Sequence, residues 1–146
     1  MIRDKTIAAI VVAAGTGSRA GTAGDLPKQY RPIAGVPLLS RTLNALIDHA
    51  GIDWVLPVIH AGHADAYAAL GIENDRILAP VSGGDSRQSS VRAGLEALSP
   101  RRPDLVLIQD AARPFLDASV IDGVIDALAT HEGALPVVPV TDTIKR

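Results

Sequence analysis

The residues that could do chemistry gather in a glycine-rich segment that follows the first apolar run of the chain. This segment carries Arg19, Lys28 and Arg31 against a single acid, Asp25. Glycines let backbone N–H groups approach an anion, and the cations add positive charge beside them. The segment is therefore either a binding site for a phosphorylated ligand or a solvated loop whose charges keep it soluble.

The start of this loop, GTGSRA from Gly15, fits the G-x-G-x-x-G/A pattern of dinucleotide-binding proteins. That pattern requires a helix that begins at the glycines and points its N-terminus at the pyrophosphate. Gly21, Gly24, Pro27 and Pro32 oppose such a helix. A P-loop is not indicated either, because no Gly-Lys-Ser/Thr follows at the required spacing. The pattern therefore favours neither of these nucleotide-binding motifs.

Composition narrows the classes of protein that the chain can belong to. Its 146 residues are 47% hydrophobic and 21% charged, with a net charge of -2, which is typical of one globular domain. This charge argues against a nucleic-acid binder that works by bulk positive charge, and 3% aromatic residues argue against base-stacking platforms. The absence of cysteine excludes disulfides and thiolate metal sites.

The sequence gives no indication of a membrane partner. The longest apolar run, residues 7–14, is far shorter than the roughly 20 residues that cross a bilayer. The first residues lack the shape of a signal peptide, because the apolar run leads directly into the glycine loop. We expect the protein to be cytoplasmic.

Short apolar runs alternate with amphipathic segments along the chain. Unbroken apolar runs are typical of strands buried on both faces of a parallel sheet, and stripes at helical spacing predict the intervening helices. Asp85 or Ser86 is expected to cap one helix, and Pro136 and Pro139 indicate that the last strand bends or lies at an edge. The expected strands are residues 7–14, 54–60, 76–81, 105–109 and 135–140, and the expected helices are residues 37–50, 64–70, 86–98 and a helix beginning at Asp117.

This alternation predicts an α/β fold with a mainly parallel sheet. Ligands of such sheets bind beyond the carboxyl ends of the strands. Three predicted loops occupy that position, namely residues 15–30, 82–85 and 110–114. These loops also carry the unusual glycines and charges, so we expect the functional site there.

Five motifs occur in register along the chain: AAGTGSR from Ala13, PKQY from Pro27, GGDSR from Gly83, DAARP from Asp110 and VTDTIK from Val140. With these motifs the chain resembles the 2-C-methyl-D-erythritol 4-phosphate cytidylyltransferase family from residue 7 to its end. The resemblance implies a Rossmann-like, three-layer nucleotidyltransferase fold that lacks its last elements. Residues 1–146 would then be one cytidylyltransferase domain, related to nucleotide-diphospho-sugar transferases, incomplete at its carboxyl end.

The resemblance also implies a reaction. Enzymes of this family transfer CMP from CTP to 2-C-methyl-D-erythritol 4-phosphate and release pyrophosphate, with Mg²⁺ or another divalent cation, in non-mevalonate isoprenoid biosynthesis. A phosphate monoester is already largely dianionic at neutral pH because its second pKa is about 6. The attacking group therefore needs no general base, and positioned cations do most of the work.

Residue by residue, the family implies Arg19 and Lys28 as the catalytic cations. A metal ion would be bound mainly by the CTP phosphates, and Asp110 is its possible ligand from the protein. The implied nucleotide-binding residues are Ala13, Ala14, Gly15, Gly17, Gly84, Asp85, Ser90, Asp110 and Ala111. The implied substrate-binding residues are Asp110, Arg113, Thr143 and Lys145. Asp85 could instead be only a helix cap, and Ser90 only a hydroxyl on a helix face.

Several alternatives and partners stay open at this point. A ribitol 5-phosphate or other sugar-phosphate cytidylyltransferase is the nearest alternative, and a non-catalytic nucleotide-binding or assembly module is another. The family implies CTP and a small polyol phosphate as ligands and a homodimer of the full-length protein. Some relatives are fused to a cyclodiphosphate synthase domain. The histidines match no functional position and are expected at the surface: His49, His60, His63 and His131.

Overall fold

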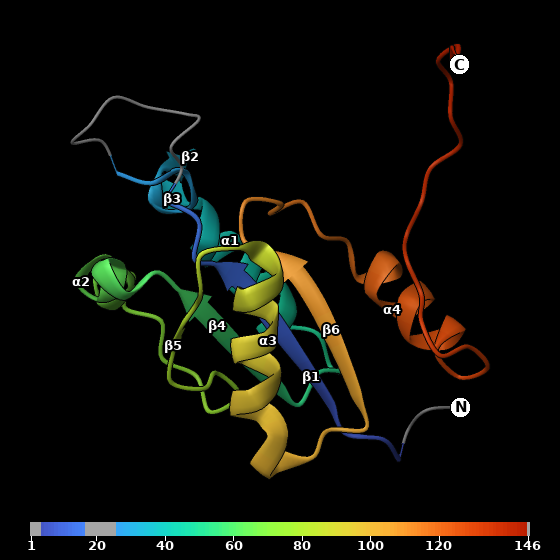
Figure 1. Cartoon of the computed structure of the whole chain (residues 1–146), viewed down its shortest axis with the longest axis horizontal. Coiled ribbons are helices and arrows are strands. Elements are labelled where there is room, and N and C mark those ends of the chain that lie inside the picture. Colours follow the sequence, from blue (N-terminus) through green and yellow to red (C-terminus); the bar gives the residue numbers. More distant parts are fainter. Residues whose placement is uncertain (1–3, 17–25, 146) are drawn as a thin grey trace.

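The fold is built on one parallel sheet with the strand order β5-β4-β1-β6 (Figure 1). A computed structural model describes residues 4–16 and 26–145. A short antiparallel ribbon, β2-β3, stands apart from the main sheet. The elements are β1 Ile7–Ala13, η1 Lys28–Tyr30, β2 Pro32–Ile33, β3 Val36–Pro37, α1 Leu38–Ile47, β4 Trp54–Ile59, η2 Ala61–His63, α2 Ala64–Ala68, β5 Val81–Ser82, α3 Arg87–Leu98, η3 Ser99–Arg101, β6 Leu105–Asp110 and α4 Ala118–Ala127.

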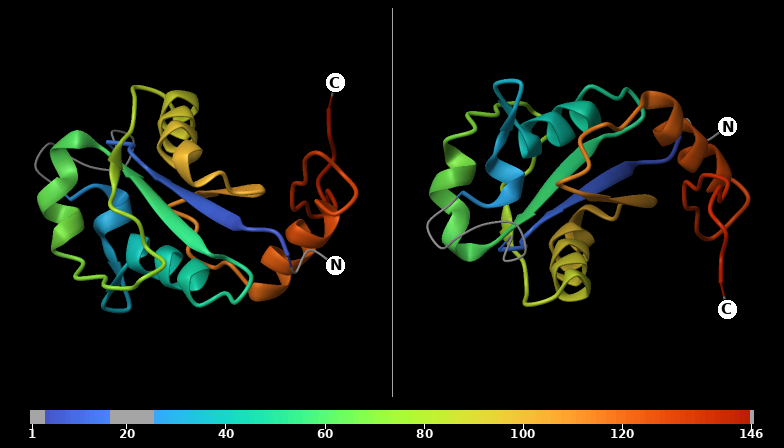
Figure 2. Two further views of the ribbon diagram at one scale, coloured as in Figure 1. Left: turned by 90° about the horizontal axis from the view of Figure 1, so that it is seen from below. Right: turned by 90° about the horizontal axis from the view of Figure 1, so that it is seen from above.

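Strand β1 lies at the centre, paired with β4 on one side and β6 on the other. Its side chains alternate between two cores. Ala9 and Val11 face the core that includes α1 and α4, whereas Ala8 and Ile10 face the core that includes Leu98 of α3. The helices therefore cover opposite faces of the sheet (Figure 2), and the expected three-layer α/β fold with a mainly parallel sheet is confirmed.

Helix α1 forms because its apolar residues recur at helical spacing. Leu39, Leu43 and Leu46 are almost completely buried against the sheet. The carboxyl end of α1 is held by Arg76, whose Nη1 donates to the carbonyls of Ile47 and His49, both at 3.1 Å. These bonds satisfy carbonyls that a helix end leaves without intrahelical partners.

The expected third strand, residues 76–81, is only partly present. Ile77 makes a single parallel bridge to Val55, and regular pairing with β4 is confined to Val81–Ser82. Asp75 and Arg76 lie in a turn closed by the Asn74 side chain, which accepts from the Arg76 N–H at 2.9 Å. The turn limits how many residues can align with β4.

The expected fifth strand, residues 135–140, is wrong for this structure. The segment is irregular and exposed, and it pairs with no strand among the described residues. Figure 1 shows the chain leaving α4 and running away from the sheet. The physical reason is that an extended segment becomes a strand only by pairing, and Pro136 and Pro139 lack the N–H donors that pairing requires.

Helix α4 is attached to the core by part of its apolar stripe. Ile121 and Ile125 are buried, whereas Val120 remains 37% exposed. The helix is also tied to the end of α1, because Nε2 of His49 lies 3.1 Å from a carboxylate oxygen of Asp122. In the described part of the chain, no helix has the length and apolar character needed to span a membrane.

Gly94 provides a direct test of the packing between α3 and the sheet. A Cβ atom at Gly94 would lie 3.0 Å from Cδ1 of Ile10 and 3.1 Å from Cγ2 of Val58. Replacement by valine should overpack this contact and lower the free energy of unfolding by about 1–3 kcal/mol. Urea unfolding of the Gly94→Val variant measures this loss.

The matched control is Gly123→Val in α4, where a Cβ would meet nothing within 4 Å. Glycine and valine differ little in helix propensity, so this control should change stability by less than about 0.5 kcal/mol. Equal stabilities of the two variants would contradict the packing described for α3.

Candidate functional site

A cavity of about 860 Å³ opens at the carboxyl ends of β1 and β6. It is lined by residues of the loop after β1, of the segment before α3 and of the loop after β6. These are the loops that the sequence predicted for a ligand of a parallel sheet. The predicted site residues that line it are Ala13, Ala14, Gly15, Lys28, Gly84, Asp85, Ser90, Asp110, Ala111 and Arg113.

The turn after the glycine-rich loop supplies one cation to the cavity, Lys28. It begins the 3-10 turn η1, and its side chain is exposed at the cavity. Among the described residues, no carboxylate lies within ion-pairing distance of Lys28. Its ammonium charge is therefore available to an anionic ligand. The other predicted cation, Arg19, and Gly17 lie outside the described residues.

The segment before α3 approaches the first loop so closely that side chains do not fit there. A Cβ at Gly83 would collide with the Cβ of Ala14, and a Cβ at Gly84 would collide with the side chain of Ser89. Glycine is required at Gly83 because this residue lies against the loop after β1, and at Gly84 because that residue lies against the first turn of α3. This close approach brings the predicted base-reading segment against the end of β1.

The sequence left Asp85 and Ser86 as alternative N-caps of α3. Ser86, not Asp85, is the N-cap, and its side chain and that of Ser89 form a reciprocal capping box. The Asp85 carboxylate is therefore not used for capping and lies exposed at the cavity. The amino end of α3 also faces the cavity, where its partial positive charge favours anions.

Ser90 is buried, with an exposed fraction of 2%, and its hydroxyl has partners within the protein. The oxygen accepts from the Gly84 N–H at 3.2 Å, and the hydroxyl donates to the Ser86 carbonyl at 2.9 Å. These bonds fix the turn that carries Gly84 and Asp85. The helix-face interpretation of Ser90 thus explains its hydrogen bonds, although the residue also lines the cavity.

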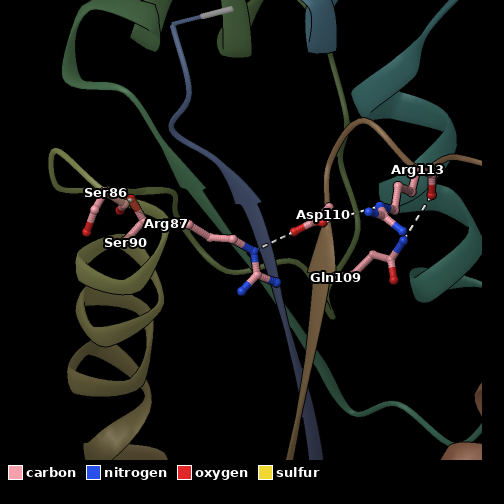
Figure 3. Close-up of polar contacts among 6 residues, drawn as sticks. All are labelled: Ser86, Arg87, Ser90, Gln109, Asp110 and Arg113. Carbon is pink, nitrogen blue, oxygen red and sulfur yellow. Dashed lines mark hydrogen bonds and ion pairs between the residues drawn. The ribbon is translucent and has the colours of Figure 1, made fainter. Parts of the chain in front are cut away.

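Asp110 stands between two arginines at the mouth of the cavity (Figure 3). One carboxylate oxygen lies 2.9 Å from Nε of Arg87, and the other lies 3.3 Å from Nε of Arg113. Arg113 is positioned by a turn, since its N–H donates to the Asp110 carbonyl and its own carbonyl accepts from the Gln109 amide at 2.9 Å. The cluster joins the loop after β6 to the start of α3.

Ala111 is held in the wall of the cavity by its backbone. Its N–H donates to the Val12 carbonyl at 3.0 Å, and its carbonyl accepts from the Thr42 hydroxyl at 2.8 Å. Ala111 itself is 2% exposed, so these bonds fix a buried residue in the lining of the cavity.

The donor set suits a magnesium ion only if the ligand supplies most of its coordination. Mg²⁺ is commonly held by one or two carboxylates together with substrate phosphates. Asp110 and Asp85 line the cavity, whereas the described residues contain no cluster of three or more metal-ligating side chains. A metal ion bound through nucleotide phosphates and Asp110 fits these residues.

The cavity also contains residues that the sequence did not assign, and some assigned residues lie elsewhere. His60, Gln29 and Arg87 line it without having been counted as site residues. Thr143 and Lys145 are exposed on the tail beyond α4 and do not line it. The structure therefore does not bring these two together with the other predicted residues.

The expectation that the histidines lie at the surface is wrong for His49 and incomplete for His63. Only 9% of the His49 side chain is exposed, because it packs between the end of α1 and Asp122 of α4. His63 is half-buried and meets Tyr30 edge to face, with ring centroids 5.5 Å apart. Burial lowers the pKa of His63 and raises the pKa of Tyr30 to about 12.

The depressed pKa of His63 predicts a loss of stability in acid. In the unfolded chain His63 recovers its ordinary pKa of about 6.5, so the unfolded state binds the proton more readily. Its stabilising contribution is complete above that pH and is lost as the pH falls below it. Urea unfolding of His63→Gln near pH 7.5 and near pH 5.5 should therefore show a smaller acid loss than the wild type.

His131→Gln is the control for this comparison, because His131 is exposed beyond the end of α4. It should lose as much stability in acid as the wild type does. The interpretation would be overturned if His63→Gln and the wild type lost stability equally.

The sequence and the fold have clear relatives. The family model described as "IspD: 2-C-methyl-D-erythritol 4-phosphate cytidylyltransferase" matches residues 7–146. A bifunctional enzyme IspD/IspF of Bradyrhizobium sp. (strain BTAi1) is 51% identical over 145 residues, which cover 99% of this chain and 36% of that protein. The protein of the same description from Paramagnetospirillum magneticum is 52% identical over 139 residues, or 94% of this chain and 35% of that one.

Solved structures agree with this relationship. The crystal structure of 4-diphosphocytidyl-2C-methyl-D-erythritol synthase from Anaerococcus prevotii superposes with a TM-score of 0.74 at 28% identity, covering 88% of this chain and 53% of that one. Another crystal structure of a 4-diphosphocytidyl-2C-methyl-D-erythritol synthase gives 0.76 at 25% identity, covering 98% and 64%. The chain spans about a third of the length of the curated relatives, 36% in the first of them. On this sequence and fold evidence, the chain belongs to the 2-C-methyl-D-erythritol 4-phosphate cytidylyltransferase family.

Proposed function

We propose that this chain forms the nucleotide site of an enzyme that transfers CMP from CTP to 2-C-methyl-D-erythritol 4-phosphate. The observation that carries the proposal is the cavity in which Lys28, Arg87 and Arg113 converge with the glycine-rich backbone of two loops. Cations and backbone N–H groups in one concave site suit a polyanion. Family membership supports CTP as the nucleotide and the polyol phosphate as the acceptor.

The reaction is an in-line displacement at the α-phosphorus of CTP. An oxygen of the acceptor phosphate forms a bond to this phosphorus while the bond to the bridging oxygen of the β-phosphate breaks, and pyrophosphate leaves with the electron pair. The acceptor oxygen is already ionised near neutral pH, so no side chain has to remove a proton. The protein has to neutralise negative charge that spreads over the transferring group.

Lys28 is the described residue best suited to neutralise that charge. Its ammonium group lies at the cavity without a carboxylate partner among the described residues, so binding a phosphate breaks no existing ion pair. We assign it, together with Arg19, to the stabilisation of the transition state. A divalent cation bound by the CTP phosphates and Asp110 would add further positive charge to the triphosphate.

The segment of Gly84, Asp85 and Ser90 is assigned to the base. Cytosine presents an amino donor beside acceptor atoms, and a carboxylate is a suitable acceptor for that amino group. The Asp85 side chain does not cap α3 and is exposed at the cavity. Uracil presents an acceptor where cytosine presents the amino group, so the same carboxylate disfavours UTP.

Asp110 and Arg113 are assigned to ligand hydroxyls and to the acceptor phosphate. The ion pairs with Arg87 and Arg113 hold the carboxylate in place and leave each guanidinium with further N–H donors. Thr143 and Lys145 remain predicted substrate ligands by family resemblance. For the whole protein we propose a fused cyclodiphosphate synthase domain, by analogy with the bifunctional relatives. The homodimer is proposed from the family resemblance, and the cytoplasmic location from the sequence.

Replacement of Lys28 by alanine in the full-length protein tests the catalytic assignment. Loss of a charge that acts on the transition state should lower kcat about 100-fold to 1000-fold. The affinity for CTP should change much less. A pyrophosphate-release assay measures kcat, and calorimetry measures CTP binding.

Lys5→Ala is the matched control, since Lys5 is exposed at the opposite end of β1 from the cavity. It should leave both quantities unchanged. A Lys28→Ala variant that loses affinity while keeping its turnover would support a non-catalytic nucleotide-binding module instead.

Replacement of Asp85 by alanine tests the assignment of the base. The 146-residue chain should bind CTP with Mg²⁺ more tightly than UTP, and Asp85→Ala should reduce that preference about tenfold, as expected for one lost base contact. Calorimetry with both nucleotides measures the preference. Asp65→Ala on α2 is the control. An unchanged ratio of CTP to UTP affinity in Asp85→Ala would remove Asp85 from the base-reading role.

A further inference from the structure

The Gln29 side chain connects the turn that carries Lys28 to the loop after β1. Its exposed fraction is 6%, so it is almost completely buried. The amide nitrogen Nε2 donates to the Ala13 carbonyl at 2.9 Å and to the Gly15 carbonyl at 2.8 Å. Both N–H groups of this amide are thus used on the backbone of the loop that lines the cavity.

The two hydrogen bonds from Gln29 also determine the direction of the neighbouring backbone N–H groups. In a trans peptide the C=O of one residue and the N–H of the next point in opposite directions. The carbonyls of Ala13 and Gly15 are directed at Gln29, so the N–H groups of Ala14 and Thr16 are directed away from it. Among the described residues, neither N–H has a hydrogen-bond acceptor. The geometry leaves these two donors for a ligand at the lining of the cavity.

The same side chain also fixes where Lys28 stands. The turn is closed by a bond from the Tyr30 N–H to the Pro27 carbonyl at 2.9 Å, and Tyr30 itself is 4% exposed in the core. Gln29 lies between the exposed lysine and this buried tyrosine. Its amide therefore sets the position of the ammonium group relative to the loop backbone.

We propose that Gln29 is a positioning residue that presents the Ala14 and Thr16 N–H groups and the Lys28 ammonium together to the phosphates of the nucleotide. The proposal rests on the proposed function, because it assumes that CTP binds in this cavity. The proposal goes further in explaining the geometry of the loop, which is held by a buried amide that need not contact the ligand. Without its two donors, the loop would have to be ordered by the ligand at a cost in affinity.

The experiment compares Gln29→Met with Gln88→Met in the 146-residue chain. Methionine has nearly the length of glutamine but no donors, and Gln88 is an exposed residue of α3 that does not line the cavity. Calorimetry with CTP and Mg²⁺ should give an affinity about tenfold lower for Gln29→Met, as expected for the loss of two modest hydrogen bonds. Gln88→Met should bind like the wild type.

An amide NMR titration separates positioning from a general loss of stability. On addition of CTP, the Ala14 and Thr16 amide signals should shift in the wild type and in Gln88→Met, and shift much less in Gln29→Met. Far-UV circular dichroism and urea unfolding first establish that each variant is folded at the temperature used. If Gln29→Met does not fold, Gln29→Asn keeps the amide on a shorter side chain that cannot reach both carbonyls, and it should show the same loss.

The outcomes distinguish this inference from the proposed function. If the wild type does not bind CTP, the proposed function fails and the inference fails with it. If the wild type binds CTP and folded Gln29→Met binds it equally well, with the same amide shifts, only the positioning role of Gln29 is overturned.

Discussion

The structure depends on the burial of β1 on both of its faces. Ala8, Ala9, Ile10 and Val11 are completely buried, so this strand can exist only between two layers of helices. Its pairing with β4 and β6 then brings the carboxyl ends of these strands to the same edge of the sheet. The cavity is formed at that edge because the chain must turn there, and the turns carry the glycines and charges.

The site combines fixed backbone with adjustable charge. Close contact between Gly83 and Ala14, together with the Gln29 amide, fixes the backbone wall. The arginines on either side of Asp110 are mostly exposed, with 61% of the Arg87 side chain and 79% of the Arg113 side chain accessible. Exposed guanidinium groups can change partners at little cost, whereas the buried wall cannot. The shape of the cavity is therefore set before a ligand binds, whereas the arginine side chains can rearrange once it has bound.

The sequence was sufficient where the structure is decided by local pattern. The unbroken apolar run of β1 and the helical stripe of α1 gave these elements within a few residues. It was insufficient where structure depends on a partner: residues 135–140 have a strand-like pattern but pair with no strand in the described part of the chain. Gln29 was missed for a related reason. Its partners are backbone carbonyls, which every sequence contains, so no residue pattern marks them. The cap at Ser86 was one of two alternatives that only the geometry could separate.

The pairing of β1 with β6 also governs how this domain is made. Thr6 and Asp104, which are hydrogen-bonded to each other just before the two strands begin, are 98 residues apart in the chain. Such non-local contacts close large loops before they gain any contact energy, and domains rich in them fold slowly. During synthesis β1 leaves the ribosome long before β6 exists, so its apolar edge is unpaired for that interval. The nascent protein must therefore keep this apolar strand from pairing wrongly until translation has supplied β6.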